Sequence, residues 1–208
     1  LAHDLVEATS DAGAYVQLSG VLKRTSAKLT KICNDIRLLA SGPRCGLNEI
    51  DLPQMQPGSS IMPGKVNPVI PEVVNQTGFL VIGLDLTVTL AASAGQLQLN
   101  VMEPVIAFAL FTSITTMERA VDTLRTHCVD GITANAERTR EMVLNSLGIV
   151  TLLKPSLGYK LCGEIAKEGF ETGRSLREIV VERRRLLTAE QWDEIFSFEN
   201  LIAPRFDA

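Results

Sequence analysis

The stretch LVEATSDAGAYVQLSGVLKRTSAKLTKICNDIRLLA, residues 5–40, determines the fold that the sequence predicts. Within it, apolar or small residues recur at alternating spacings of three and four, which places them along one face of an α-helix. Several of them are alanine or serine, so a neighbouring helix can approach closely. We predict one helix over residues 1–40, roughly 60 Å long at a rise of 1.5 Å per residue, that ends at Ser41-Gly42-Pro43. The residues on this face are 5, 8, 12, 15, 19, 22, 26, 29, 33, 36 and 40.

Two further long helices are predicted, at residues 68–92 and 104–128. The first is apolar on nearly every face between Val73 and Ala92, which is typical of a helix surrounded by other helices. Three long helices with such spacing predict an all-α fold built on a bundle of long helices. Their apolar faces exceed what one chain can cover, so we expect several copies of the chain to share the bundle. The spaced positions are 74, 77, 81, 84, 88 and 91 in one helix and 107, 110, 114, 117, 121, 124 and 128 in the other.

The segments after Gly131 are shorter and predict a small helical domain. The last two of its helices are preceded by sequences typical of capping boxes, which begin at Ser175 and Thr188. The predicted domains are therefore a helix-bundle domain over residues 1–131 and a small helical C-terminal domain over residues 132–208. The helices expected in the second domain lie near 136–147, 159–170, 176–187 and 189–197.

Composition and charge exclude several classes of partner. The chain has 208 residues, 46% of them apolar, and its 20 Lys and Arg against 24 Asp and Glu give a net charge of −4. Without a basic excess, a nucleic-acid partner is not expected. The most apolar stretch, residues 79–92, is interrupted by Asp85 and is short for a bilayer, so no membrane partner is expected either.

The cysteines and histidines do not form a recognisable metal-binding pattern. Four widely spaced cysteines are accompanied by only two histidines, and we therefore predict no metal site. No secretory signal is recognised ahead of them, which indicates reduced thiols and a cytoplasmic protein. His3 is interpreted as a helix-surface residue and His127 as a residue near a helix C-terminus. The cysteines are Cys33, Cys45, Cys128 and Cys162.

The loop before the second long helix carries the candidate chemistry. Residues 58–68 read GSSIMPGKVNP, with two serines and a lysine close to glycines. Asn67 is predicted to cap the following helix and Pro68 to be its first residue, so that Lys65, the Asn67 amide and the positive helix end face one point. Glu72, in the first turn, can pair with Lys65 or orient it. Each feature alone is ordinary for a loop or a helix start, but together they favour a site for a small anion such as a carboxylate.

The pattern Gly-Ser-Ser-x-Met-Pro-x-Lys-x-Asn-Pro in residues 58–68 resembles the signature of the aspartase/fumarase superfamily of lyases. The similarity extends over nearly all of the chain, which resembles only the C-terminal part of the family's subunit and so looks like a piece of a longer protein. Within the superfamily the chain is most similar to the aspartate ammonia-lyases. Further matching stretches are residues 41–53, 65–76, 95–106, 131–135 and 145–151.

The resemblance implies an all-helical, three-domain subunit and a homotetramer built around a shared bundle of long helices. Residues 1–131 would be the C-terminal portion of the central bundle domain. The reaction implied is the reversible elimination of ammonia from L-aspartate to give fumarate, with no cofactor. The implied partners are therefore a small dicarboxylate and further copies of the same chain.

The resemblance also implies roles for individual residues. The family's catalytic loop corresponds to residues 54–66, in which Ser59 would be the base that removes the β-proton of aspartate. Glu72 would support the site. The residues that would bind the substrate carboxylates are Ser60, Lys65 and Asn67.

Two alternatives stay open at this point. A class II fumarase would hydrate the same fumarate, and it shares the loop but usually differs from this sequence at residues 69–72 and 96–99. A non-catalytic helical scaffold would keep the fold and the oligomer, but intact Ser59, Lys65 and Asn67 argue against it. Argininosuccinate and adenylosuccinate lyases act on larger substrates and differ around the lysine. Because the family's active site combines residues of three subunits, we expect these 208 residues alone to be inactive.

Overall fold

A computed structural model describes residues 2–56 and 66–203 of the chain. Its contacts divide the chain into two compact units, Leu1–Asn135 and Ala136–Ala208, and each is described by itself. The predicted all-α fold is confirmed, since the described elements are helices and helical turns apart from two short strands. These strands, β1 (Ile50–Asp51) and β2 (Thr133–Ala134), pair antiparallel in the first unit.

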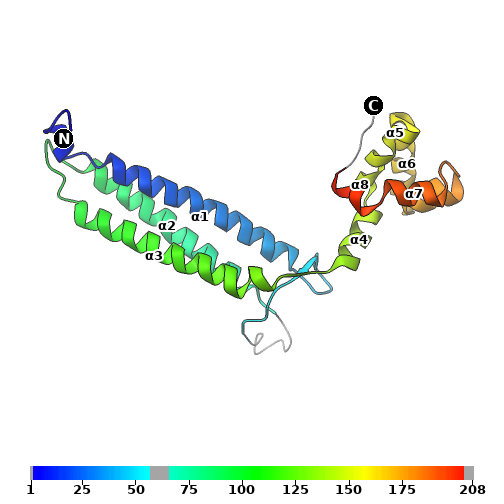
Figure 1. Ribbon diagram of the computed structural model, residues 1–208, viewed down its shortest axis with the longest axis horizontal. Helices are drawn as coiled ribbons and strands as arrows, with labels where there is room; N and C mark the ends of the chain where they lie inside the picture. Colours follow the sequence, from blue (N-terminus) through cyan, green and yellow to red (C-terminus); the bar gives the residue numbers. More distant parts are fainter. Residues whose placement is uncertain (1, 57–65, 204–208) are drawn as a thin grey trace. The chain divides into compact units, whose positions relative to one another are not determined.

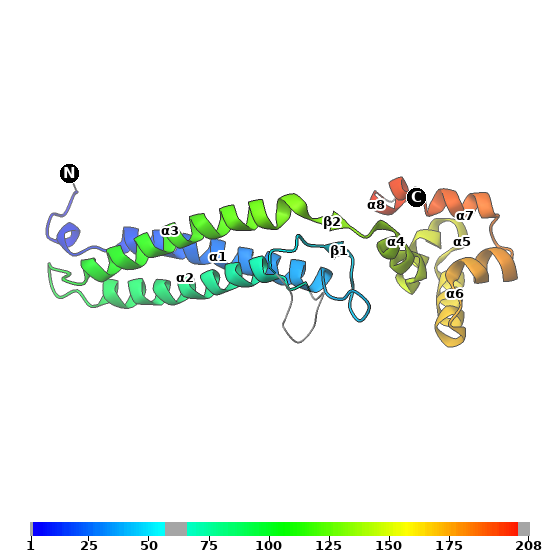
Figure 2. The same cartoon turned by 90° about the horizontal axis from the view of Figure 1, so that it is seen from below.

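Three long helices run side by side in the first unit, as both views of it show (Figure 1 and Figure 2). They are α1 (Gly13–Leu39), α2 (Val69–Ser93) and α3 (Glu103–His127). α2 packs along both of the others and runs antiparallel to α1. The end of α1, the start of α2 and the end of α3 therefore meet at one end of the unit, beside the β1–β2 pair.

α1 begins at Gly13, so the prediction of one helix from residue 1 is wrong. A 3-10 turn, η1 (Glu7–Thr9), precedes it, and the Asp4 carboxylate accepts hydrogen bonds from two backbone N–H groups there at 2.9 and 3.1 Å. Asp11 likewise accepts from the Gly13 N–H at 2.8 Å. Short side chains that bond nearby backbone groups compete with a continuing helix. α1 thus has 27 residues and is about 40 Å long, and His3 lies outside any helix.

The predicted apolar stripe of α2 is confirmed, and that of α1 is confirmed within its shorter bounds except at Tyr15, which is exposed. In each helix a set of buried residues recurs every seven positions, so that one face of α1 meets one face of α2. The α1 face carries small side chains, which allows the two backbones to approach closely. The buried sets include Ser19, Ser26 and Cys33 in α1 and Val74, Val81 and Val88 in α2.

α3 is rotated relative to its predicted stripe, of which only part is correct. Leu110, Met117, Leu124 and Cys128 are buried as predicted, whereas Ala107, Ile114 and Val121 are exposed. Ser113 and Ala120 are buried in place of Ile114 and Val121. The smaller side chains let α3 approach its neighbours more closely than the β-branched ones would, which the apolar pattern alone does not reveal.

Asp85 is a buried charge in the otherwise apolar middle of α2. It is 6% exposed, its Oδ1 accepts a hydrogen bond from Ser19 Oγ at 2.8 Å, and its Oδ2 lies 2.6 Å from Lys23 Nζ. A buried carboxylate is tolerated when it is paired and hydrogen-bonded, so this contact selects which turn of α1 lies opposite α2.

The apolar segments are longer than the sequence analysis allowed. By length and composition alone, α2 and residues 103–131 could each cross a membrane. The expectation that the most apolar stretch is too short for a bilayer is therefore wrong as far as length is concerned. α2 carries the Asp85–Lys23 ion pair near its middle, where hydrocarbon would make a charge costly.

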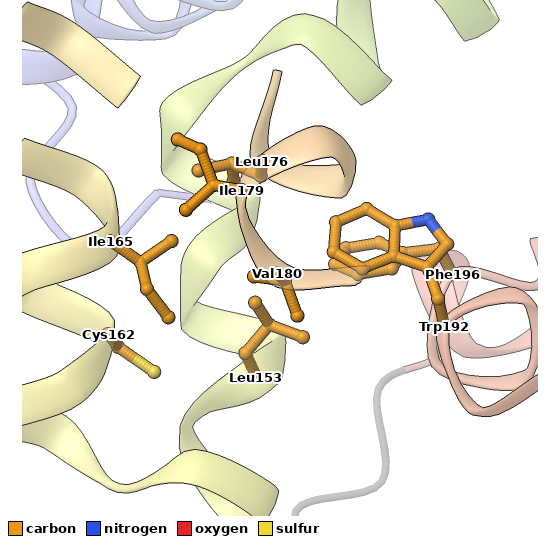
Figure 3. Packing of buried hydrophobic residues seen from close by; sticks show 8 residues of the cluster. All are labelled: Leu153, Cys162, Ile165, Leu176, Ile179, Val180, Trp192 and Phe196. Atoms are coloured by element: carbon orange, nitrogen blue, oxygen red, sulfur yellow. The ribbon is translucent and has the colours of Figure 1, made fainter. Parts of the chain in front are cut away.

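The second unit packs around one apolar core (Figure 3). Trp192 and Phe196 lie at one side of this core with their ring centroids 4.1 Å apart. The other buried members are Leu153, Cys162, Ile165, Leu176, Ile179 and Val180. The elements are α4 (Ala136–Asn145), η3 (Leu147–Leu153), α5 (Lys154–Leu157), α6 (Tyr159–Thr172), η4 (Glu178–Arg183), α7 (Ala189–Ile195) and α8 (Phe198–Ile202).

Two of the helices predicted for this unit differ from the structure. The helix expected at 136–147 ends at Asn145, because the Ser146 hydroxyl accepts from the Gly148 N–H at 3.2 Å and starts the 3-10 helix η3 instead. The helix expected at 176–187 is a short π-helical segment, η4, rather than an α-helix. Apolar spacing alone does not separate these helix types.

The two predicted capping boxes have different outcomes. Thr188 and Gln191 form the full reciprocal pair, with hydrogen bonds of 3.2 and 2.9 Å. Ser175 Oγ accepts from the Glu178 N–H at 3.2 Å, but the Glu178 carboxylate instead lies 2.8 Å from Arg174 Nε. The ion pair with Arg174 therefore takes the place of the hydrogen bond that the Glu178 carboxylate would accept from the Ser175 N–H in a full capping box.

The four cysteines are free, as predicted, and three of them are buried. Burial raises the pKa of Cys33 to about 11; the neighbouring Cys128 adds to this rise and Arg37 opposes it. Burial also raises the pKa of Cys128 and of Cys162. Only Cys45 is exposed.

We predict that Asp85→Ala destabilises the fold by about 2 kcal/mol, because the Ser19 hydroxyl and the Lys23 ammonium lose a buried, charged partner. Urea unfolding followed by far-UV circular dichroism measures the change. The matched control is Asp35→Ala, which removes an exposed partner of Lys31 and should cost no more than about 0.5 kcal/mol. Equal effects of the two variants would contradict a specific role for Asp85.

A second prediction concerns thiol reactivity. At mildly alkaline pH, iodoacetamide should label Cys45 in the folded protein, while the buried thiols react only after unfolding. The thiolate is the reactive form, and a raised pKa lowers its population at any pH below that value. Mass-spectrometric mapping of labelled sites as pH rises tests this. Labelling of Cys33, Cys128 or Cys162 as fast as that of Cys45 would show the prediction to be wrong.

Candidate active site

Asn67 and Pro68 lead the chain into α2 by a tight turn. Pro68 has φ −78° and ψ 55°, and the Val69 N–H donates to the Asn67 carbonyl at 2.9 Å, which is an inverse γ-turn. α2 therefore begins at Val69, with Pro68 as the residue before it and no side-chain hydrogen bond at its cap. The prediction of Asn67 as the cap and Pro68 as the first helical residue is wrong, because the turn at Pro68 separates Asn67 from the helix.

A shallow hollow with room for about one water molecule opens at this end of the first unit. It brings together the chain that leaves β1, the start of α2 and the end of α3. Asn67 and His127 both line it, and His127 Nδ1 lies 2.6 Å from Thr126 Oγ1. His127 is at a helix C-terminus as expected, but its place beside Asn67 was not predicted. The other lining residues are Leu52, Pro53, Met55, Pro68, Val69, Ile70, Pro71 and Cys128.

Three of the predicted site residues, Ser59, Ser60 and Lys65, lie outside the described residues. Of the predicted set, the structure thus places Asn67 in the hollow and Glu72 in the first turn of α2. The roles expected for all five residues stay predictions, as does the pairing of Glu72 with Lys65.

Glu72 has a partner that was not predicted, Arg37 from the last turn of α1. Glu72 Oε1 lies 3.9 Å from Arg37 Nη2, and both side chains are 41% exposed. The signal for this pair is topological: an antiparallel α2 that follows α1 after a loop must bring its first turn beside the last turn of α1. Without knowledge of the antiparallel packing, no feature of the sequence predicts that residues 37 and 72 are in contact.

The charge distribution at this end favours an anion over a cation. The N-terminus of α2, a helix of 25 residues, supplies the positive end of a dipole, but the Val69 and Glu72 N–H groups already donate to the Asn67 and Pro68 carbonyls and Pro71 has no N–H. The Asn67 amide adds a donor, while the charge of Arg37 is offset by its partner Glu72. Among residues 2–56 and 66–203 no group of three or more His, Cys, Asp or Glu is placed to hold a metal ion.

Two family models match the chain. One, described as a lyase model, covers residues 1–83, and the other, the C-terminal model of fumarase C, covers residues 149–203. The aspartate ammonia-lyase of Helicobacter pylori is 61% identical over 98% of this chain and 43% of its own length. That of Escherichia coli K12 is 58% identical over the whole chain and again 43% of its own length.

Solved structures match as well. A fumarate lyase:delta crystallin structure from Brucella melitensis bound to cobalt superposes with a TM-score of 0.88 at 50% identity, over 93% of this chain and 42% of that one. A class II fumarase from Schistosoma mansoni superposes with a TM-score of 0.88 at 37% identity, over 98% of this chain and 42% of that one.

The chain spans about 43% of the length of the curated relatives it matches. Within that span, the chain is 58–61% identical to these aspartate ammonia-lyases and matches both family models. The chain belongs to the aspartase/fumarase superfamily of lyases.

Proposed function

We propose that these 208 residues act as part of an aspartate ammonia-lyase, which eliminates ammonia from L-aspartate to give fumarate. The observation that carries the proposal is the identity of 58–61% with aspartate ammonia-lyases along nearly the whole chain. The class II fumarase match at 37% identity supports the alternative, hydration of fumarate, less strongly. The intact motif at residues 58–68 favours catalysis over a scaffold role.

The reaction requires removal of a proton next to the β-carboxylate. This leaves a dianionic, enediolate-like group, so the site must present positive charge and N–H donors where that charge develops. We assign this role to Lys65, Asn67 and the N-terminus of α2, and carboxylate binding also to Ser60. Loss of one such donor typically costs about a hundredfold to a thousandfold in rate.

Ser59 is proposed as the base. A hydroxyl is a poor base at neutral pH, and it acts as one only where its alkoxide is stabilised by the same positive groups and water is excluded. The proposal requires no organic cofactor. Glu72, held beside Arg37, would support the site from the first turn of α2.

We propose a homotetramer in which α2 and α3 join a bundle shared between copies, in a cytoplasmic enzyme. The support is a large apolar surface that one copy leaves open, including Phe111 at 70% exposure. The family's site combines residues of three subunits, so these residues alone should lack activity. Other exposed apolar side chains on the two helices are Phe79, Leu86, Leu90 and Phe108.

We predict that the complete protein converts aspartate to fumarate, followed by fumarate absorbance, and leaves malate unchanged under the same conditions. Conversion of malate alone would replace the proposal with the fumarase alternative. The isolated 208-residue chain serves as the control and should be inactive. Robust turnover by that chain would contradict a site composed of several subunits.

We also predict that Ser59→Ala in the complete protein lowers kcat for aspartate by roughly a thousandfold, within the range known for loss of a general base. The matched control is Ser93→Ala at the opposite end of α2, whose hydroxyl bonds only the Leu90 carbonyl among the described residues. Its kcat should equal that of the parent. If Ser59→Ala turns over aspartate as fast as the parent, another group is the base.

A further inference from the structure

The contact between α1 and α2 becomes polar near the start of α2. Further along, apart from the contact of Asp85 with Ser19 and Lys23, the facing residues are valines and small side chains. Here, by contrast, amide, hydroxyl and charged groups from both helices face one another. On α1 these polar residues follow one face at spacings of four and three. They are Thr30, Asn34 and Arg37 on α1 and Glu72 and Asn75 on α2.

Gly78 of α2 leaves no room for a side chain against Thr30 of α1. A Cβ atom added there would lie 2.5 Å from Thr30 Oγ1, closer than real Cβ contacts come. Gly78 is buried, so a side chain in its place would collide with the Thr30 hydroxyl, although the nearest backbone atom of α1, the Ser26 carbonyl oxygen, would be 3.5 Å away. The contact favours one position of α1 along α2, and it involves Thr30, the first of the polar residues on α1.

Asn75 forms the next contact between α1 and α2 in the direction of the start of α2, where the candidate active site lies. It is 4% exposed, and its amide is hydrogen-bonded in either orientation. In one, its Nδ2 donates to Asn34 Oδ1 at 2.8 Å; in the other, its nitrogen donates to the Thr30 carbonyl at 3.3 Å and its oxygen accepts from Arg37 Nη1 at 3.2 Å. The two orientations exclude each other, but both place the Asn75 amide between Thr30, Asn34 and Arg37 of α1.

Arg37 connects this buried amide pair to Glu72. Its Nη1 donates to Asn34 Oδ1 at 3.4 Å, while its Nη2 lies 3.9 Å from Glu72 Oε1. The planar guanidinium cannot turn freely while one edge is held by an amide, so its other edge offers Glu72 a fixed partner. Both charged side chains are 41% exposed, and an ion pair of that exposure adds little to stability.

We propose that Arg37 is a positioning residue: anchored by Asn34, which contacts the buried Asn75, it holds the Glu72 carboxylate in one orientation in the first turn of α2. The inference rests on the proposed function, in which Glu72 supports the site. Its consequence is that Arg37 acts on catalysis through Glu72, since small misplacements of a site residue cost more in rate than in stability.

Arg37→Gln in the complete protein tests this. We expect kcat for aspartate to fall roughly tenfold to a hundredfold, with little change in KM and in the thermal midpoint. Arg37→Lys keeps the charge but loses the forked donor, and should recover part of the activity. Arg24→Gln, an exposed arginine on the same helix, is the matched control and should behave as the parent.

A double-mutant cycle separates positioning from a general structural effect. If Arg37 acts through Glu72, the Arg37→Gln/Glu72→Gln double variant should be no slower than Glu72→Gln alone. The inference would be overturned if the two substitutions lowered kcat by independent factors that multiply in the double variant. A kcat of Arg37→Gln within twofold of the parent value would also overturn it. The parent's turnover of aspartate tests the proposed function separately: if the parent is active and Glu72→Gln is impaired, failure of Arg37→Gln to slow the enzyme counts against the inference alone.

Discussion

The register of α1 along α2 is the constraint on which the first unit depends. An apolar stripe that repeats every seven residues buries surface well, but one repeat resembles the next, so burial alone permits sliding by two turns. Each polar or close contact can form at only one position of α1 along α2, so we interpret these contacts as the source of the register. In antiparallel order along the two helices these contacts are Asp85 with Ser19 and Lys23, Gly78 with Thr30, Asn75 with Asn34, and Glu72 with Arg37.

The sequence predicted those parts of the fold in which local signals and tertiary packing agree. The stripe through Val74, Val81 and Val88 is such a case, because the helix and its buried face follow from one spacing. The predictions failed where two signals competed. Asp11 bonds the Gly13 N–H and ends the extension of α1 toward residue 1. In α3 two apolar stripes were available, and packing selected the one with small Ser113 and Ala120 rather than the more apolar one.

The sequence predicted only those residues of the candidate site that belong to one contiguous motif. Asn67 and Glu72 come from one contiguous segment, so a pattern could identify them together. Arg37 and His127 come from other helices, and their proximity to that segment follows from antiparallel packing and from the end of α3 lying beside the start of α2. A single sequence carries no direct signal for such contacts. The error at Asn67 is of the same kind: the dipeptide Asn-Pro suits a cap or a γ-turn, and the surrounding chain decided between them.

The open apolar faces of α2 and α3 bear on catalysis as well as on assembly. Donors that stabilise a developing carbanion must be fixed before the charge appears, and a loop alone cannot fix them. Here the end of the loop is joined to the first turn of a 25-residue helix, whose position is set by α1. One side of that helix is held, while Phe79, Leu86 and Leu90 remain exposed on its other faces. Covering those faces with further copies would hold the helix on all sides, and the proposed assembly would thereby give the active site its rigidity.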